Sequence, residues 1–511
     1  MNLQDAFANL GVDWVPRPIQ ELLVGELVDG GSRLSFLEAP TGIGKSAIAL
    51  CYGDLIEAKT CVLTTTLSLQ NQYVRDFDVA LLKGRANYVC SANGLRASEG
   101  ICQASRDAEA CDSEYYDARE ACRTAPRIVT NYAMYLTSLL HHSLPWNSQG
   151  GPRRLLVCDE GHRLLDQLTE FETLCLDGPL AKRLGFDDAE GWQTIEDAVT
   201  WANYNLDSIE EGRYDAIQYG AQDARLWNTL YHQCTALAKL SVEDQEALIP
   251  LQTGKYLQAC SLWPRRTSRR LFNSAERMLI MSATLYGGSL LSQILGFDEE
   301  EEGGGGRFNA AFHSAPSPFP KHRWPVLYSP RGAPNHTNND WAGIAEAVHE
   351  YVHANRAIKG IVHVAAANQV EPVTRQARLC LECSPYLLLP EPGITRADTL
   401  AMFRRRRPGT WLVHYSAGEG EDFKDGQCRI QLIAKLPFPD LGDKLTRLRL
   451  EDPGLGKKLY AAMTAAKIAQ IAGRGMRHEK DWCSTVILDG NFERLWRWHQ
   501  DLFPEWFRRL L

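Results

Sequence analysis

At 511 residues the chain is long enough for roughly three or four domains, and its apolar content can fill several hydrophobic cores. It has no charged-then-apolar N-terminal segment and no long apolar run, so we expect a protein that is neither exported nor embedded in a membrane. Fourteen cysteines in a chain of this length are too sparse for a disulfide scaffold. The net charge of −8 argues against a protein that coats nucleic acid indiscriminately, but such a charge is compatible with a locally basic channel.

The first part of the chain alternates short apolar strands with helices. A helix is expected from Ser46, directly after a glycine-rich loop. Short apolar strands alternating with helices indicate a parallel sheet covered by helices on both faces. Residues 81–122 interrupt the alternation with polar sequence and four cysteines. The strands expected in this first sheet lie at 34–39, 61–64, 127–130, 154–158 and 277–281.

The later part of the chain repeats this alternation. Residues 166–255 are rich in Glu, Asp, Gln, Leu and Ala at helical spacing and predict a helical insert. The acidic and glycine-rich stretch 298–306 predicts a surface loop. Two such sheets in one chain suggest two motor domains with a nucleotide between them. The strands expected in the second sheet lie at 360–364, 411–414, 430–433 and 485–488.

The glycine-rich loop is Ala39-Pro-Thr-Gly-Ile-Gly-Lys45-Ser46. Its glycines let backbone N–H groups approach phosphates, Lys45 can neutralise the β/γ charge, and the Ser46 hydroxyl can hold Mg²⁺. Ala39 stands where the strict phosphate-loop pattern has glycine, and the remaining pattern is typical of helicases. A chance glycine-rich turn is the alternative, which the preceding strand and the following helix disfavour.

An acid pair ends the strand Val157-Cys-Asp159-Glu160-Gly-His162. Adjacent carboxylates at the end of an apolar strand are costly without a cation. Asp159 is therefore expected to bind Mg²⁺, and Glu160 to orient the water that attacks the γ-phosphate. The pair alone is a moderate signal, but downstream of a phosphate loop it becomes a strong one.

The order of these motifs resembles the DinG and XPD branch of superfamily 2 helicases over nearly the whole chain. Arg17-Pro-Ile-Gln20 is similar to the family's opening motif, and Thr64–Gln72 is similar to the stretch that contacts the DNA backbone. Asp159-Glu-Gly-His162 is the DinG form of the acid pair. Ser282-Ala-Thr284 is similar to the coupling motif.

Further stretches carry the same resemblance. Leu82–Cys90 is similar to the lead-in to the first cluster cysteine, and Thr130-Asn131-Tyr132 to the turn before the acid pair. Gly418–Gly426, followed by Lys435-Leu-Pro-Phe-Pro439, resembles motif V. Gln470–Arg477 resembles motif VI, whose arginines reach the γ-phosphate, a task that suits a planar guanidinium of permanent charge. An exposed basic helix is the alternative for that last run.

The resemblance implies two RecA-like parallel-sheet motor domains, with an inserted iron–sulfur domain and a helical arch. The first motor domain is expected at 1–80, 123–165 and 256–289, the iron–sulfur domain at 81–122, the arch at 166–255 and the second motor domain at 290–511.

The resemblance also implies roles for particular residues. ATP and Mg²⁺ are expected at Arg17, Gln20, Thr41, Gly42, Gly44, Lys45, Ser46, Asp159 and Asp422. The residues expected to act in catalysis are Lys45, Asp159, Glu160, His162, Gln470, Arg474 and Arg477. Coupling is expected at Ser282 and Thr284, DNA contacts at Thr65, Gln72 and Asn131, and a [4Fe-4S] cluster at Cys90, Cys102, Cys111 and Cys122.

The four cysteines need separate weighing. They lack the short paired spacing of a zinc ribbon, and Fe–S clusters accept looser spacing. Buried core cysteines are the alternative. If residues 111–122 formed one helix, Cys122 would lie about 16 Å from Cys111, too far for one cluster. Either that helix breaks, or Cys122 is a core cysteine; we expect four ligands.

The implied function is an ATP-dependent DNA helicase or translocase that moves 5′ to 3′ on single-stranded DNA and unwinds duplexes. Its partners would be single-stranded, fork or bubble DNA, with no membrane. A cytoplasmic or nucleoid-associated monomer is expected, or one in the host cytoplasm if a phage encodes it. Two rivals stay open: a translocase that strips proteins or RNA without processive unwinding, and a non-catalytic, cluster-bearing binding protein.

Three other features are interpreted as structural. Cys380-Leu-Glu-Cys383 has metal spacing but no second pair nearby, so a helix end and a turn are expected there. Arg404–Arg407 suits either phosphate contact or a solvated basic loop. Trp192, Trp201 and Trp227 are expected in the core rather than as stacking platforms.

Overall fold

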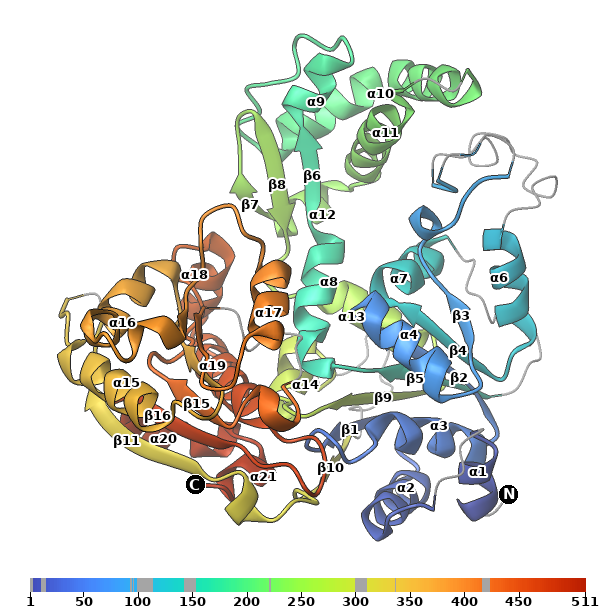
Figure 1. The fold of residues 1–511 in the computed structure, drawn as a ribbon. Coiled ribbons are helices and arrows are strands. Elements are labelled where there is room, and N and C mark those ends of the chain that lie inside the picture. The colour runs from blue at the N-terminus through green and yellow to red at the C-terminus, as the bar shows by residue number, and fades with distance from the viewer. Residues whose placement is uncertain are drawn as a thin grey trace. The chain divides into compact units, whose positions relative to one another are not determined.

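Two β-sheets with parallel strands form the framework of the computed structural model (Figure 1). The structure describes residues 3–10, 15–91, 94, 96–98, 114–141, 153–219, 222–298, 310–335, 337–415 and 423–511.

The first sheet has seven strands in the order β10-β1-β9-β5-β2-β4-β3. The pairs β9–β5, β5–β2, β2–β4 and β4–β3 are parallel. Parallel pairing brings the carboxyl ends of these strands to one edge, where loops can carry a site. The strands are β1 (Leu34–Glu38), β2 (Ala58–Thr64), β3 (Ala80–Leu82), β4 (Arg127–Asn131), β5 (Arg153–Cys158), β9 (Arg277–Ser282) and β10 (Ala310–Ser314).

Helices connect these strands, and two of them start at side-chain caps. Thr66 accepts the Leu69 N–H at the start of α4, and Asn131 accepts the Met134 N–H at the start of α7. The helices are α1 (Leu3–Ala8), α2 (Pro18–Gly30), α3 (Lys45–Leu55), α4 (Leu67–Asp76), α6 (Glu114–Thr124), α7 (Tyr132–Leu140), α8 (Leu164–Glu172), α13 (Arg265–Asn273) and α14 (Ser289–Leu295).

The predicted helical insert is helical, and it also contains a small antiparallel sheet in the order β6-β8-β7. Strand β8 continues this sheet to Cys260, past the expected boundary at 255. Trp192 and Trp201 are buried in the insert's core and Trp227 packs against it, as expected. The elements are β6 (Leu174–Asp177), α9 (Gly178–Arg183), α10 (Ile195–Gln218), α11 (Ala224–Ala238), α12 (Val242–Ala247), β7 (Ile249–Gln252) and β8 (Tyr256–Cys260).

The second sheet has six strands in the order β11-β16-β15-β12-β14-β13, and all its pairs are parallel. Its strands are β11 (Val326–Gly332), β12 (Gly360–His363), β13 (Leu387–Leu388), β14 (Trp411–His414), β15 (Ile430–Ile433) and β16 (Ser484–Asp489). The accompanying helices are α15 (Ala342–Ala354), α16 (Val370–Leu379), α17 (Arg396–Arg405), α18 (Lys444–Glu451), α19 (Gly456–Gly473), α20 (Asn491–His499) and α21 (Glu505–Arg508).

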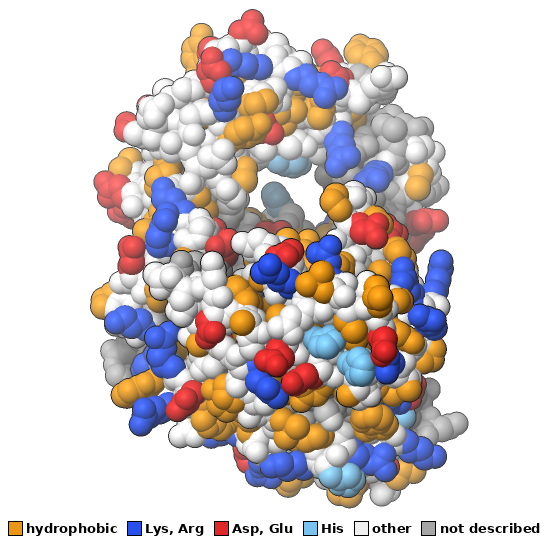
Figure 2. All heavy atoms as spheres, turned by 60° about the vertical axis from the view of Figure 1, so that its left-hand side comes forward, with side chains coloured by type: hydrophobic (Ala, Val, Ile, Leu, Met, Phe, Trp, Pro, Cys, Tyr) orange, Lys and Arg blue, Asp and Glu red, His pale blue; other side chains and the backbone are white. Residues whose placement is uncertain are grey.

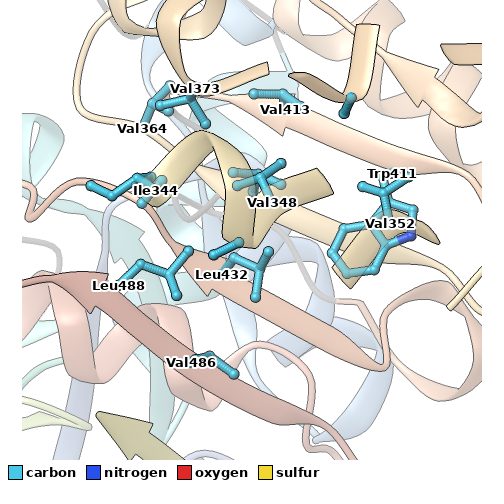
Figure 3. Packing of buried hydrophobic residues seen from close by; sticks show 14 of the residues in the cluster. Ile344, Val348, Val352, Val364, Val373, Trp411, Val413, Leu432, Val486 and Leu488 are labelled. Carbon is cyan, nitrogen blue, oxygen red and sulfur yellow. The ribbon is translucent and has the colours of Figure 1, made fainter. Parts of the chain in front are cut away.

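The core of the second sheet is built on one face of α15 (Figure 3). Ile344, Val348 and Val352 recur every fourth residue and are fully buried with aliphatic side chains of the strands. Trp411 is buried in the same cluster. A Cβ at Gly360 would lie 2.5 Å from the Trp411 ring, so glycine is needed where the indole crosses β12.

The chain separates into two compact units. The first comprises Met1–Ser35, Ser46–Ile280 and Ser292–Ala310. The second comprises Phe36–Lys45, Met281–Leu291 and Ala311–Leu511, and therefore includes the carboxyl ends of β1 and β9. The phosphate loop and Ser282-Ala-Thr284 thus belong to the same unit as the second sheet.

The expected α/β class with two parallel-paired sheets is confirmed, because the strands predicted from apolar runs are present. The inserted iron–sulfur domain stays a prediction, since most of residues 92–113 lie outside the described residues. Most of the acidic and glycine-rich stretch 298–306 lies outside the described residues. No helix within the described ranges is both long and apolar enough to cross a membrane. On the face shown in Figure 2, basic and acidic side chains are interspersed.

Candidate active site

The phosphate loop joins β1 to α3. Gly42 and Gly44 have φ angles of +82° and +86°, in the left-handed region that favours glycine. The Lys45 ammonium donates to the carbonyls of Ala39 (2.9 Å) and Pro40 (3.3 Å). The loop therefore holds the Lys45 ammonium, the positive charge that would bind a phosphate group, against its own backbone.

Gly42 is also needed for packing. A Cβ at this position would lie 2.8 Å from Cζ of Phe319 and 3.3 Å from the carbonyl oxygen of Arg477. Phe319 was not predicted as a site residue, because nothing in its sequence surroundings distinguishes it from a core aromatic. The aromatic ring and the end of the motif VI stretch thus contact the loop directly.

The loop is anchored to the Ser-Ala-Thr motif by one backbone hydrogen bond and one bond to a side-chain carboxylate. The Ala39 N–H donates to the Ser282 carbonyl (3.0 Å), and the Leu285 N–H donates to Glu38 Oε1 (2.6 Å). Burial raises the pKa of Glu38 to about 7, partly opposed by the Leu285 N–H and by Arg508. Glu38 was not predicted as a site residue, although it directly precedes the loop.

Helix α19 places the motif VI residues beside the same anchor. The Gln470 side-chain amide donates to the Thr284 hydroxyl (3.0 Å), and the Thr41 hydroxyl donates to the Gly473 carbonyl (3.3 Å). Arg474 and Arg477 follow at the end of α19, and both are half-buried. The second unit thus brings together the loop, the coupling motif and motif VI.

The acid pair lies in the first unit, at the end of β5. Asp159 is buried, and its Oδ2 accepts a hydrogen bond from the Tyr73 hydroxyl (2.8 Å). The Tyr73 hydroxyl in turn accepts from Ser46, and burial raises the pKa of Tyr73 well above its usual value, which keeps it protonated. Tyr73 therefore links the two side chains that are expected to bind Mg²⁺.

The second member of the pair has a different backbone. Glu160 has a φ of +51°, a left-handed conformation that is rare outside glycine and recurs at functional sites. Its Oε2 lies 3.3 Å from Nδ1 of His162, and it is more exposed than Asp159. The turn therefore directs the two carboxylates to different surroundings, one buried and one open to water.

Other predicted residues have local roles in the described structure. Gln20 Oε1 accepts the Arg17 N–H (2.9 Å) at the start of α2, and the Asn131 amide caps α7. Thr65 is half-buried and Gln72 is exposed. Asp422 lies outside the described residues.

Two of the four candidate cluster cysteines are described, and Cys102 and Cys111 lie outside the described residues. Cys90 and Cys122 are both buried. Cys122 lies on α6, and burial raises the pKa of its thiol to about 11. Lys59 and the Tyr88 hydroxyl both interact electrostatically with this thiol.

Part of the chain is similar in sequence to known helicases. Residues 349–509 match the helicase C-terminal domain family. A protein named "Probable ATP-dependent helicase MJ0942" from Methanocaldococcus jannaschii is 22% identical over 231 residues, 34% of this chain and 35% of that protein. A regulator of telomere elongation helicase 1 homolog from Caenorhabditis briggsae is 26% identical over 106 residues, 18% of this chain and 10% of that protein. The matches therefore span about a third or less of these curated relatives.

Solved structures extend the likeness to the whole fold. An XPD helicase structure has a TM-score of 0.66 at 15% identity and covers 96% of this chain and 98% of its own. Xpd4 of S. tokodaii has a TM-score of 0.58 at 13% identity, with the same coverage. The fold is thus similar to that of these XPD structures.

Together, the domain match, the sequence relative and the fold make the chain similar to XPD/DinG-like superfamily 2 helicases. The resemblance inferred from the motifs is thereby confirmed.

Replacing Tyr73 by phenylalanine tests the link between Ser46 and Asp159. A hydrogen bond to a charged group contributes about 1.5–3 kcal/mol, so we expect the Mg²⁺ concentration for half-maximal ATP hydrolysis to rise roughly 10-fold. Tyr135→Phe is the matched control, because the Tyr135 hydroxyl contacts Ser274 instead (2.7 Å). Steady-state ATPase rates across a Mg²⁺ titration measure the effect, and an unchanged titration for Tyr73→Phe would contradict the assignment.

Proposed function

We propose that the chain is an ATP-dependent DNA helicase or translocase that moves 5′ to 3′ along a single strand and separates duplex DNA. The observation that carries the proposal is the hydrogen-bonded assembly of phosphate loop, Ser-Ala-Thr motif and α19 in the second unit. These hydrogen bonds join the phosphate loop, which would bind ATP, to Thr284 and Gln470, which would respond to ATP binding and hydrolysis. The polarity rests on the family resemblance.

ATP hydrolysis would depend on the lysine of the phosphate loop, the acid pair and the motif VI arginines. Lys45 would neutralise the β/γ-phosphates, while Arg474 and Arg477 would stabilise the charge that develops on the γ-phosphate. Glu160 would orient the attacking water, with His162 at hydrogen-bonding distance from its carboxylate. Arg17, Gln20, Thr41 and Asp422 would complete the nucleotide site.

The Ser46 hydroxyl and the Asp159 carboxylate are the oxygen donors that suit Mg²⁺. When bound there, the ion would offset the negative charge of the phosphates. The Tyr73 hydroxyl is hydrogen-bonded to both Ser46 and Asp159, which supports a joint role of these two side chains in binding the ion.

Coupling to DNA would pass through Gln470. This residue lines a hollow at the carboxyl ends of β12 and β15, together with His363, Tyr415, Phe438 and Lys467. Tyr415 is 47% exposed and could stack on a base, while burial lowers the pKa of His363 to about 4 and keeps it neutral. Thr65, Gln72 and Asn131 would be further DNA contacts. Movement of Gln470 would couple the state of the bound nucleotide to the bound DNA strand.

A [4Fe-4S] cluster on Cys90, Cys102, Cys111 and Cys122 would form a rigid wedge at the duplex junction. Lys59 supports it, because its positive charge partly opposes the rise in the Cys122 pKa that burial causes, and a thiolate-bound cluster needs such compensation. The cluster would supply rigidity, with no redox step required.

Lys45→Ala tests the motor. Because the ammonium stabilises charge on the transferred phosphoryl group, we expect the DNA-stimulated ATPase rate to fall roughly 100-fold or more and forked-duplex separation to be lost. Lys239→Ala, an exposed lysine at the end of α11, is the control and should change neither.

Three outcomes separate the candidate functions in that experiment. Separation of a forked duplex supports the helicase. Displacement of streptavidin from a biotinylated single strand, without duplex separation, favours the translocase. A wild-type protein that binds DNA, hydrolyses no ATP and is unchanged by Lys45→Ala would identify the non-catalytic binding protein.

Cys122→Ser tests the cluster. Iron and acid-labile sulfide in anaerobically purified protein should approach four of each per chain, as a cubane cluster requires, and fall sharply in Cys122→Ser. Cys175→Ser, at an exposed cysteine, should leave both unchanged. Full iron content in Cys122→Ser would show that this thiol is not a ligand.

A further inference from the structure

Three metal-binding side chains converge in the second unit, and none of them belongs to the ATPase motifs. His349 lies on α15, Cys380 caps the end of α16, and Cys383 follows in the next turn. One ring nitrogen of His349 and the two sulfur atoms lie within 4.8 Å of one another. Tetrahedral zinc with two thiolates needs roughly 3.5–3.8 Å between ligand atoms, so only a small contraction is required.

The backbone shapes this turn for a thiolate pair. The Cys380 carbonyl accepts the N–H groups of Cys383 (3.1 Å) and Ser384 (2.9 Å), which closes the turn. The N–H groups of Glu382 and Cys383 face the Cys380 sulfur, and the His349 ring contacts it as well. Such N–H donors stabilise a metal-bound sulfur, because they offset its negative charge.

The burial of the three side chains fits a site with one open position. Cys383 is fully buried against the core, whereas Cys380 and His349 are half-buried. Because Cys380 and His349 are both partly accessible, a water molecule could reach the metal as the fourth ligand.

The neighbouring histidine is already engaged. His353 follows His349 by one helical turn, and its Nε2 lies 3.1 Å from the Glu382 carboxylate, which also pairs with Arg356. The two histidines therefore have different roles, although both lie on α15. His353 provides a matched control for any test of His349.

A second group of metal-type ligands gives a useful contrast. Asp425, His478 and Asp481 also lie close together. There, however, Arg429 pairs with Asp481 (2.5 Å), and His478 itself lies 2.7 Å from Asp425, so these carboxylates already have partners within the protein. By contrast, the group of His349, Cys380 and Cys383 contains two thiols, which are softer ligands than carboxylates.

We propose that His349, Cys380 and Cys383 bind one zinc ion with a water as fourth ligand. Two thiolates and an imidazole are the donor set that zinc prefers over magnesium or calcium. The ion would join α15 to the segment before β13, the two-residue edge strand of the second sheet. A strand this short makes few hydrogen bonds of its own, so the metal would fix its position.

Zinc content and cobalt spectroscopy on the full-length protein test this proposal. Protein purified with a non-thiol reductant is titrated with Zn²⁺ against a chromophoric chelator. His349→Gln and Cys380→Ser should each lose about one equivalent of zinc, or bind it at least roughly 100-fold more weakly. His353→Gln and Cys175→Ser should match the wild type. Co²⁺ should give sulfur-to-metal charge-transfer absorption that disappears in Cys380→Ser.

Other outcomes would overturn the proposal. Equal zinc content and equal cobalt spectra in the wild type, His349→Gln and Cys380→Ser would exclude the site, provided circular dichroism shows that the variants are folded. A Cys380–Cys383 disulfide in protein purified without reductant, with no zinc uptake after reduction, would identify a redox pair instead. Iron measured in the same samples separates this site from the four candidate cluster cysteines.

Discussion

The joint between the phosphate loop and the Ser-Ala-Thr motif is the constraint on which the rest of the candidate site depends. Two backbone donors, the N–H groups of Ala39 and Leu285, cross from one segment to the other. Buried backbone groups are costly to leave without partners, so the loop cannot shift without disturbing residues 282–285. Gln470 then extends the joint to α19 through Thr284. A movement of the phosphate loop would thus be passed through these hydrogen bonds to α19, which packs with the second sheet.

The sequence predicted most of this framework, because its signals are local. Apolar runs of strand length and the glycine loop depend on neighbours along the chain, and the structure has strands at the predicted places. The strands that were not predicted have weak local signals. Strand β11 contains Pro330 and lies at a sheet edge, where proline is tolerated, and β13 has only two residues. The strands of the insert's sheet are short and lie between segments with helical spacing, so their own sequence pattern is weak.

The side chains that the sequence did not reveal act across long distances in the chain. Tyr73 directly follows the predicted Gln72, yet its contact with Asp159 depends on the packing of α4. Cys380 and Cys383 were set aside for lack of further ligands, and the expected helix end and turn are present. The missing ligand, His349, is on the preceding helix and carries no sequence mark of metal binding. Only tertiary packing brings these groups together.

A double-mutant cycle on Thr284 and Gln470 tests the central claim most directly. The quantity to measure is the number of nucleotides translocated per ATP hydrolysed, for Thr284→Val, Gln470→Ala and the double variant. If the hydrogen bond transmits the nucleotide state, each single change should lower this ratio, and the double variant should be no worse than the worse single one. Two results would contradict the account: a double variant whose ratio is clearly lower than that of either single variant, or a ratio that neither single change alters.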